Sequence, residues 1–444
     1  MIRRLGSTGV FILIYIIIIA LIVDISIVRI ATSIGGIGSS YTTLFVGIVV
    51  VFAVGQYVIL AFAKSEQKEI EYKVSSHVTG RHLIDKAVTI GQYTLLAILV
   101  SVILQMIFTS SYHVFSLKAI IFISYGLSFA LLALLAKRFF SWFKSNRNLV
   151  VLVYASAVSM LSINSVITIV YTNSEFVNAP EFILNIKSLT GGYESADVLL
   201  SSAYTLTSIL SFILMWVATI LLLKHYSRKI GKAKYWIAVG IPLAYFLSQF
   251  QPLFLYSFGD LRLEDPVLFG IVYNLIYTVA KPAGGILFGI AFWTIAKHLS
   301  NQIVRKYMLI SAFGIMLLFT ANQPTFLLLV PYPPFGLVTV SFMGLASYLF
   351  YLGIYSASIS VSEDTKLRQS IRKAAIKEST EFLDSIGTAE MEQEIERRVV
   401  LATSATKENI EKETGISSSF DNEDIRTYLH EVLQEISSTR KERP

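Results

Sequence analysis

The chain has 444 residues, of which 54% are apolar and only 15% are charged. Soluble domains carry about 25% charged residues, and the mean hydropathy here is +0.63, so the composition excludes an ordinary soluble protein and indicates a membrane protein. The net charge is +7 and cysteine is absent, which excludes disulfides, thiolate nucleophiles and cysteine-ligated metal sites.

Ten segments approach the ~20 apolar residues that a helix needs to cross a bilayer. In chain order they are 9–31, 43–63, 89–109, 115–136, 149–171, 203–223, 236–258, 266–296, 307–321 and 336–361. The first follows two arginines but no small-residue cleavage site follows it, so we expect an uncleaved helix. The fold class predicted is all-α, a polytopic membrane helix bundle of about ten transmembrane helices over residues 1–361.

Basic residues alternate between the connections that join these segments. With ten crossings, the N-terminus, every second connection and the C-terminal tail share one side. The connections on that side carry nineteen Lys and Arg, whereas the opposite side carries three, counting Lys118 at the start of a span. Because cytoplasmic connections hold the Lys and Arg excess, we predict a multi-pass protein of the cell membrane with both termini cytoplasmic. The basic charge then reflects topology, and we expect no nucleic-acid partner.

Three local features outside the spans also carry expectations. The stretch FILNIKSL at 182–189 predicts a short amphipathic helix on the membrane surface. FLLLVPYPP at 326–334 is apolar but rich in proline and predicts an interfacial or re-entrant loop. Trp142 lies near a predicted cytoplasmic end, where we expect it to anchor at the membrane interface.

The segment 266–296 is interrupted by YTVAKPAGG at 277–285. As one straight helix it would be ~46 Å long, against a hydrocarbon core of ~30 Å. Pro282 removes an internal hydrogen bond, which predicts a kink that breaks the helix near 278–285 and leaves carbonyl groups near Thr278 partly unsatisfied. A charge at the position of Lys281 is costly in lipid, so this side chain is expected to face the bundle interior and to have a partner.

Asp24 is the one acidic residue inside a predicted span and is therefore the candidate partner of Lys281. Two interpretations remain open. The pair and the helix broken at Pro282 form an ion or substrate site, as broken helices do in transporters, or they form a buried ion pair that only fixes helix packing. Gln249 and Gln251 are candidates to line the same site, although such amides more often hydrogen-bond neighbouring helices.

The composition changes at residue 362, and the tail 362–444 has a net charge of −5. Its apolar residues are spaced as in amphipathic helices, the first ending at Gly387, the second spanning about 389–413 and the third starting near 421. Four basic residues beside the last span are predicted to contact anionic lipid headgroups. They are Lys366, Arg368, Arg372 and Lys373.

Sequence motifs for catalysis are absent. The chain contains no Walker, Rossmann, HExxH or GxSxG pattern and no pair of carboxylates placed for acid–base chemistry inside the spans. The six histidines have no ligand-like neighbours. We therefore expect no enzymatic activity, no cofactor and no metal.

The tail segments KLRQSIRK, ESTEFLDSIG and EDIRTYLHEVLQEI resemble uncharacterised multi-span membrane proteins of ammonia-oxidising archaea. This resemblance implies an archaeal plasma-membrane protein and carries no known activity or site.

Two functions follow from the sequence. In the first, the bundle is a membrane sensor or anchor in the lipid bilayer, and the tail 362–444 relays to or recruits a cytoplasmic protein partner or a second copy of the chain. In the alternative, the bundle is a secondary transporter or channel whose broken helix around Lys281 and Pro282 lies in the path.

Overall fold

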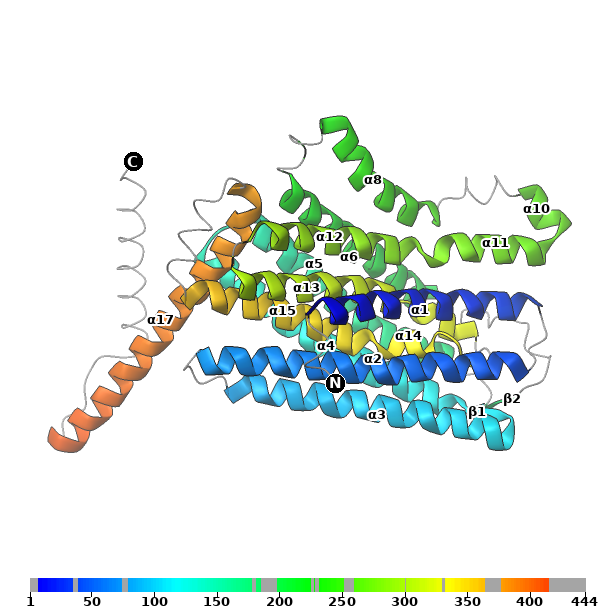
Figure 1. Ribbon diagram of the computed structural model, residues 1–444, viewed down its shortest axis with the longest axis horizontal. Helices are drawn as coiled ribbons and strands as arrows, with labels where there is room; N and C mark the ends of the chain where they lie inside the picture. Colours follow the sequence, from blue (N-terminus) through cyan, green and yellow to red (C-terminus); the bar gives the residue numbers. More distant parts are fainter. Residues whose placement is uncertain are drawn as a thin grey trace.

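The computed structural model describes residues 7–34, 39–73, 79–177, 181–184, 198–224, 227, 231–250, 259–299, 301–329, 332–363 and 377–414. Almost all of these residues are helical, and the helices form an elongated bundle (Figure 1). The predicted all-α class is therefore confirmed. The helices are α1 (Ser7–Ile34), α2 (Ser39–Lys73), α3 (Thr79–Thr109), α4 (Val114–Ser145), α5 (Leu149–Glu175), α6 (Val198–Leu223), α8 (Lys232–Ser248), α10 (Gly259–Glu264), α11 (Pro266–Thr278), α12 (Ala280–His298), α13 (Gln302–Ala321), α14 (Leu337–Ser341), α15 (Met343–Glu363) and α17 (Lys377–Thr414).

Eight helices in the described part of the chain are long and apolar enough to cross a membrane. A helix also occupies each of the other two predicted positions. In α1 the described apolar stretch is Ile12–Ile27, and α8 has 17 residues, which span only ~26 Å at 1.5 Å per residue. The structure thus supports an integral membrane protein, while the number of ten crossings stays a prediction.

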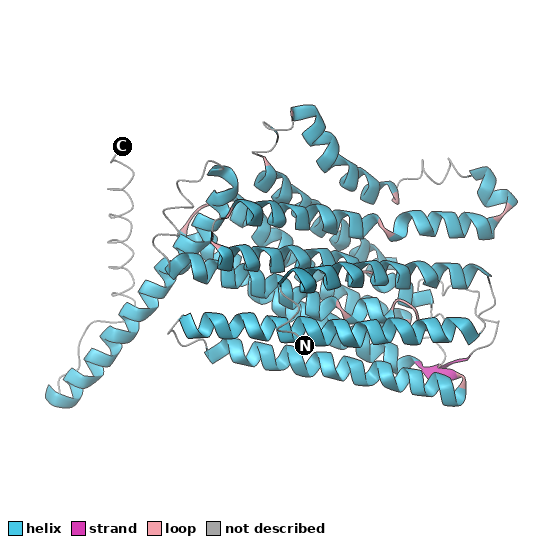
Figure 2. Cartoon of the chain, viewed as in Figure 1, coloured by secondary structure: helices cyan, strands magenta, loops and turns pink. Residues whose placement is uncertain are grey.

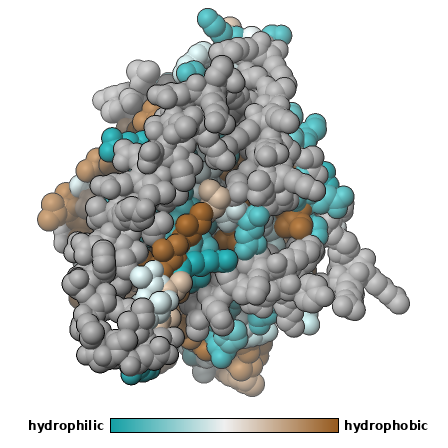
Figure 3. Space-filling model, turned by 90° about the vertical axis from the view of Figure 1, so that its left-hand side faces the viewer, coloured by the Kyte–Doolittle hydropathy of each residue, from teal (hydrophilic) through white to brown (hydrophobic). Residues whose placement is uncertain are grey.

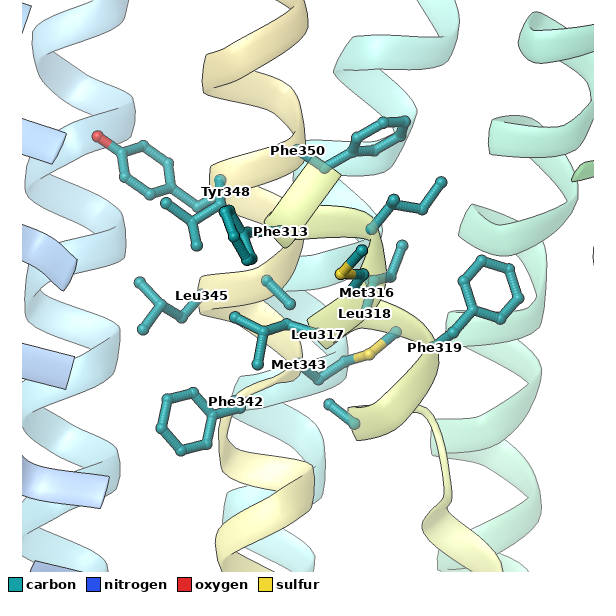
Figure 4. Packing of buried hydrophobic residues seen from close by; sticks show 14 of the residues in the cluster. Phe313, Met316, Leu317, Leu318, Phe319, Phe342, Met343, Leu345, Tyr348 and Phe350 are labelled. Atoms are coloured by element: carbon teal, nitrogen blue, oxygen red, sulfur yellow. The ribbon is translucent and has the colours of Figure 1, made fainter. Parts of the chain in front are cut away.

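Helices α13 and α15 form the centre of the bundle. The apolar window of α15 is buried over its whole length, so this helix is enclosed by protein on all sides. Glycines bring the two helices close together, because a methyl group at Gly353 would lie 2.2 Å from the Ser311 hydroxyl and one at Gly314 would lie 2.5 Å from the Phe350 amide. Close approach through small residues drives helix packing in membranes, where lipid supplies no hydrophobic force between helices. Figure 4 shows the aromatic, leucine and methionine side chains that interlock here.

Two short strands lie at the end of the bundle opposite α17 (Figures 1 and 2). Strand β1 (Ser111–His113) pairs antiparallel with β2 (Phe182–Leu184). The amphipathic helix predicted from FILNIKSL is therefore wrong for residues 182–184, and the remainder of that stretch lies outside the described residues. Residues 182–184 form a strand because their backbone pairs with that of β1. The Val114 amide also donates to the Glu181 carbonyl at 3.0 Å.

The proline-rich segment after α13 folds into the bundle. It contains the 3-10 helix η2 (Pro324–Leu329), a cis Tyr332–Pro333 bond and Gly336 in the left-handed region with φ 85°. Leu327 and Phe335 are fully buried. This burial agrees with a re-entrant loop rather than one lying on the membrane surface. Gly336 is required because its positive φ is strained for other residues, and it directly precedes α14.

The tail contains one continuous described helix, α17, which crosses the end of the bundle obliquely (Figure 1). The predicted stop at Gly387 is wrong, because α17 continues through this residue. Gly387 instead permits contact with α15, since a methyl group there would lie 2.3 Å from Cγ1 of Val361. Figure 3 looks at this end and shows hydrophobic and hydrophilic described residues side by side.

Candidate functional site

The predicted break lies between α11, which ends at Thr278, and α12, which begins at Ala280. Pro282 occupies the first turn of α12 and has no N–H to donate to the Thr278 carbonyl four residues earlier. The Gln323 amide donates to that carbonyl at 3.2 Å. The Thr278 carbonyl, predicted to be partly unsatisfied, therefore has a side-chain partner in place of the missing helical amide. Gln323 lies two residues after the end of α13, so a neighbouring segment supplies the hydrogen bond that the break removes.

Lys281 lies one residue inside α12, next to this break. Its ammonium group donates to the Asn322 backbone carbonyl at 3.0 Å and to the Tyr204 hydroxyl at 3.3 Å. The ammonium also lies 5.5 Å from the centre of the Tyr204 ring, within the range of a cation–π contact. All of these partners are neutral, and no described carboxylate forms an ion pair with Lys281.

A buried polar network surrounds these two partners. The Asn322 side chain accepts from the Tyr125 hydroxyl at 3.2 Å and donates to the Asn164 carbonyl oxygen at 3.3 Å. The Asn164 amide in turn donates to the Thr207 hydroxyl at 3.0 Å. We call this set the Lys281 cluster. Its members are Tyr125 of α4, Asn164 of α5, Tyr204 and Thr207 of α6, Lys281 of α12, and Asn322 directly after α13.

Asp24, the predicted partner of Lys281, lies elsewhere and the expected ion pair does not form. Its Oδ2 accepts from the Thr339 amide at 3.1 Å and from the Thr339 hydroxyl at 2.8 Å. Thr339 is the third residue of α14, so Asp24 caps that helix from α1. The exposed amides and partial positive charge of a helix N-terminus favour a carboxylate in this position. Asp24 therefore caps α14 through Oδ2, while its buried Oδ1 has no hydrogen-bond partner.

The remaining candidate residues do not join the cluster in the described part of the chain. Gln249 directly follows α8, where its amide donates to the Phe246 carbonyl at 2.8 Å and its own carbonyl accepts from Tyr273 of α11 at 3.1 Å. It thus links α8 to α11. Gln251 lies outside the described residues. The same holds for Lys366, Arg368, Arg372 and Lys373.

Tyr171 and Glu175 extend the polar face of α5 beyond the cluster, and sequence reasoning missed both. The Tyr171 ring stacks on Tyr204 with centroids 5.4 Å apart. Glu175 is 6% exposed, and its Oε1 has no hydrogen-bond partner. The signal was present in the spacing of Asn164, Thr168, Tyr171 and Glu175, which places all four on one side of a helix. Because the predicted span ended at residue 171, Glu175 was assigned to a loop and its place on this side of the helix was not recognised.

The first part of α17 is docked on the bundle through an aromatic contact. Phe382 is fully buried, and its ring centroid lies 5.4 Å from Tyr154, 6.4 Å from Phe139 and 6.5 Å from Phe292. Leu383 and Ile386, on the same side of the helix, are also fully buried. The tail helix therefore contacts α4, α5 and α12 directly.

A polar contact completes this interface. The Trp142 indole donates to Oε2 of Glu390 at 2.7 Å, and an Arg138 nitrogen lies 3.8 Å from Oε1 of the same carboxylate. Trp142 is fully buried, so the prediction that it anchors at the membrane interface is wrong. Its indole N–H needs an acceptor when buried, and the tail supplies one.

Farther along α17, Glu394 bonds to two arginines of its own helix. Arg398 donates to Oε1 at 2.8 Å and Arg397 donates to Oε2 at 3.0 Å. Partial burial acts to raise the pKa of Glu394, but the hydrogen bonds and positive charges of the two arginines outweigh burial and lower it overall. These contacts stabilise the helix beyond its docked part.

Taken together, these features define an integral membrane protein of helical type with a docked tail helix and, at a broken helix, a half-buried lysine on a buried polar network. Comparison with protein-family models, curated proteins and solved structures finds no match for the chain. The resemblance of the tail to archaeal membrane proteins thus stays a prediction. Among the described residues, no group of three or more His, Asp or Glu is placed to hold a metal ion.

Proposed function

We propose that the protein is a membrane sensor in which the state of the Lys281 cluster is relayed through the bundle to the tail helix α17. One observation carries this proposal: α12 contacts both regions. Lys281 lies in its first turn, and Phe292, eleven residues later, contacts Phe382 of α17. This separation is ~16 Å along the helix axis. A change in the position of α12 is therefore felt directly by the tail.

Because Phe382 contacts α12, we take the two states of the sensor to be α17 docked on the bundle and α17 undocked. A ligand shifts such an equilibrium only when it interacts differently with the two states. The docked state has a buried aromatic contact with α12, so any ligand that displaces α12 changes the docking free energy. In one of these two states, docked or undocked, the tail 362–444 would expose the surface that recruits a cytoplasmic partner or a second copy of the chain.

A cross-linking experiment tests the relay. The chain has no cysteine, so Ser145→Cys and Gln393→Cys introduce a unique pair at positions whose side chains are 3.4 Å apart. A short thiol-reactive cross-linker then reports docking. Lys281→Met should change the cross-linking rate severalfold, whereas Lys297→Met, at the exposed end of the same helix, should not. Equal rates in the two variants would refute the relay.

Capture of a partner tests the output. We expect that removal of residues 362–444 abolishes any protein cross-linked to the full chain in native membranes. If the same proteins are cross-linked to the truncated chain, the tail does not recruit them.

The cytoplasmic orientation of α17 belongs to the same proposal. Lys144 and Lys297 lie in the last turns of α4 and α12, and Ser145, next to Lys144, contacts α17. The excess of basic residues at the ends of these spans supports a cytoplasmic location for this end in the cell membrane. Labelling of a cysteine at Ser145 by an impermeant reagent in intact cells would overturn it.

A secondary transporter or channel is the second candidate, favoured by the break between α11 and α12. Broken helices with polar groups at mid-span recur at transport sites. If this function is correct, Lys281→Ala impairs ion or solute flux in reconstituted vesicles. Because Asp24 caps α14 outside the cluster, Asp24→Ala should affect flux only through stability. Absence of flux from the wild-type protein under varied gradients would exclude this candidate.

A further inference from the structure

The charge of Lys281 is not balanced by any described group. Its oxygen partners are a backbone carbonyl and a hydroxyl. Asp24 is held by Thr339. Glu175 lies four residues beyond Tyr171, whose ring stacks on Tyr204, but its Oε1 has no hydrogen-bond partner and no described ion pair joins it to Lys281. Lys281 is half-buried, and an ammonium at this depth without a counter-charge is unfavourable, so a negative charge from outside the chain would stabilise the cluster.

Two hydrogen-bond donors in the cluster are left over. An ammonium has three N–H groups, and Lys281 uses two of them on described oxygens. The Tyr204 hydroxyl accepts from Lys281 and donates to no described group. These two donors are adjacent, because the atoms that carry them lie 3.3 Å apart. Both therefore lie within reach of one small acceptor.

The start of α12 adds to the preference for a negative ligand. The partial positive charge of a helix N-terminus stabilises anions within its first turn, and Lys281 lies in that turn. The residue before the helix, Val279, provides no side-chain cap. At the start of α5 and α13 a side-chain oxygen takes this place, from Asn148 and Asn301, whereas α8, like α12, begins without one.

We propose that the Lys281 cluster binds a small monovalent anion, of halide or short-carboxylate size, held by the Lys281 ammonium and the Tyr204 hydroxyl. One uncompensated charge accounts for the valence. Dense packing accounts for the size, since α12 is in contact with Phe212 of α6 at Gly284, where a methyl group would lie 2.2 Å from the ring. The inference names the ligand of the proposed sensor and rests on that function for its role, but anion binding is measurable without the relay.

Thermal unfolding of the purified full chain in detergent tests the binding. At constant ionic strength, sodium gluconate is replaced stepwise by sodium chloride or sodium acetate. A ligand that binds only the folded state raises the unfolding midpoint in a saturable manner. We expect this rise in the wild type and in Lys297→Met, and its loss in Lys281→Met. The two salts separate a halide site from a carboxylate site.

Asn322→Asp is a second test variant, which keeps Lys281 and adds a negative charge beside it. It places a carboxylate on the residue whose backbone carbonyl holds Lys281, and Asn164 can turn its amide to donate to it. This internal anion should replace the external one, so the midpoint becomes independent of chloride and acetate. The proposal is wrong if neither salt raises the unfolding midpoint of the wild type, which is the result expected of a neutral Lys281 amine. It is also wrong if Lys281→Met and Asn322→Asp both respond to the salts as the wild type does.

The proposed relay to α17 and the proposed anion binding are tested independently of each other. A saturable midpoint shift with an unchanged rate of cross-linking between Ser145→Cys and Gln393→Cys would retain the anion site and reject the sensor. A structure determined with bromide gives a direct readout, because the ion must lie within hydrogen-bond distance of Lys281. Bromide bound only elsewhere would overturn the assignment.

Discussion

Replacing Phe382 with alanine should release α17 from the end of the bundle. The ring is fully buried and meets aromatic rings of α4, α5 and α12. Truncation of a buried phenylalanine costs about 3–5 kcal/mol when the cavity does not collapse. If α17 undocks as a unit, the whole cost falls on the docking equilibrium. Each 1.4 kcal/mol is a factor of ten, so the ratio of docked to free helix falls by roughly 10²- to 10⁴-fold.

The assay is the cross-linking of Ser145→Cys to Gln393→Cys. Phe382→Ala should slow it strongly. Leu401→Ala is the matched control, because Leu401 lies on the same helix but is 59% exposed, and surface truncations change stability by only about 0.5 kcal/mol or less. Tryptic cleavage within α17 should accelerate in parallel. If Phe382→Ala and Leu401→Ala cross-link at the same rate, Phe382 does not hold the helix and the relay loses its contact.

Three further changes follow from single contacts. Asp24→Ala leaves the Thr339 amide without an acceptor and its hydroxyl with only the Leu21 carbonyl, so it should lower the free energy of unfolding by about 1–3 kcal/mol, with a smaller loss for Asp24→Asn in thermal unfolding. Gly387→Ala places a methyl group 2.3 Å from Val361 Cγ1, so it should reduce cross-linking, and adding Val361→Ala should partly restore it. The pKa of Glu394 is lowered in the folded helix, so its contribution, about 0.3–0.5 kcal/mol per arginine pair, is present above the ordinary glutamate pKa and disappears as pH falls through the lowered value. Helix content measured by circular dichroism should then differ between wild type and Glu394→Gln at pH 7 and converge near pH 3.

The helical class and the break in the eighth predicted span were predictable because both rest on local properties. Apolar length predicts a spanning helix, and a proline lacks its N–H whatever surrounds it. The group that compensates the break was not predictable. Gln323 is near Thr278 only because α13 runs beside α12, and no feature of the sequence near either residue encodes that neighbourhood.

The wrong expectations share a cause: each residue type has two uses that differ only in tertiary context. A glycine ends a helix or admits a neighbouring helix, and Gly387 does the second because Val361 lies against it. A tryptophan anchors at an interface or is buried with an acceptor, and Trp142 has Glu390. Asp24 had two competing positive partners, a lysine and a helix N-terminus, and the sequence alone cannot rank them.

Close packing within the bundle offers a second connection from the Lys281 cluster to the tail. A methyl group at Gly289 of α12 would lie 2.8 Å from the Ala312 carbonyl of α13, and one at Gly314 of α13 would lie 2.5 Å from the Phe350 amide of α15. The end of α15 then meets α17 at Gly387. Backbone contacts this close leave no free space, and packed interiors transmit displacement rather than absorb it. We therefore expect α12, α13 and α15 to shift together, so that the tail responds to the cluster through the whole central layer and not through Phe292 alone.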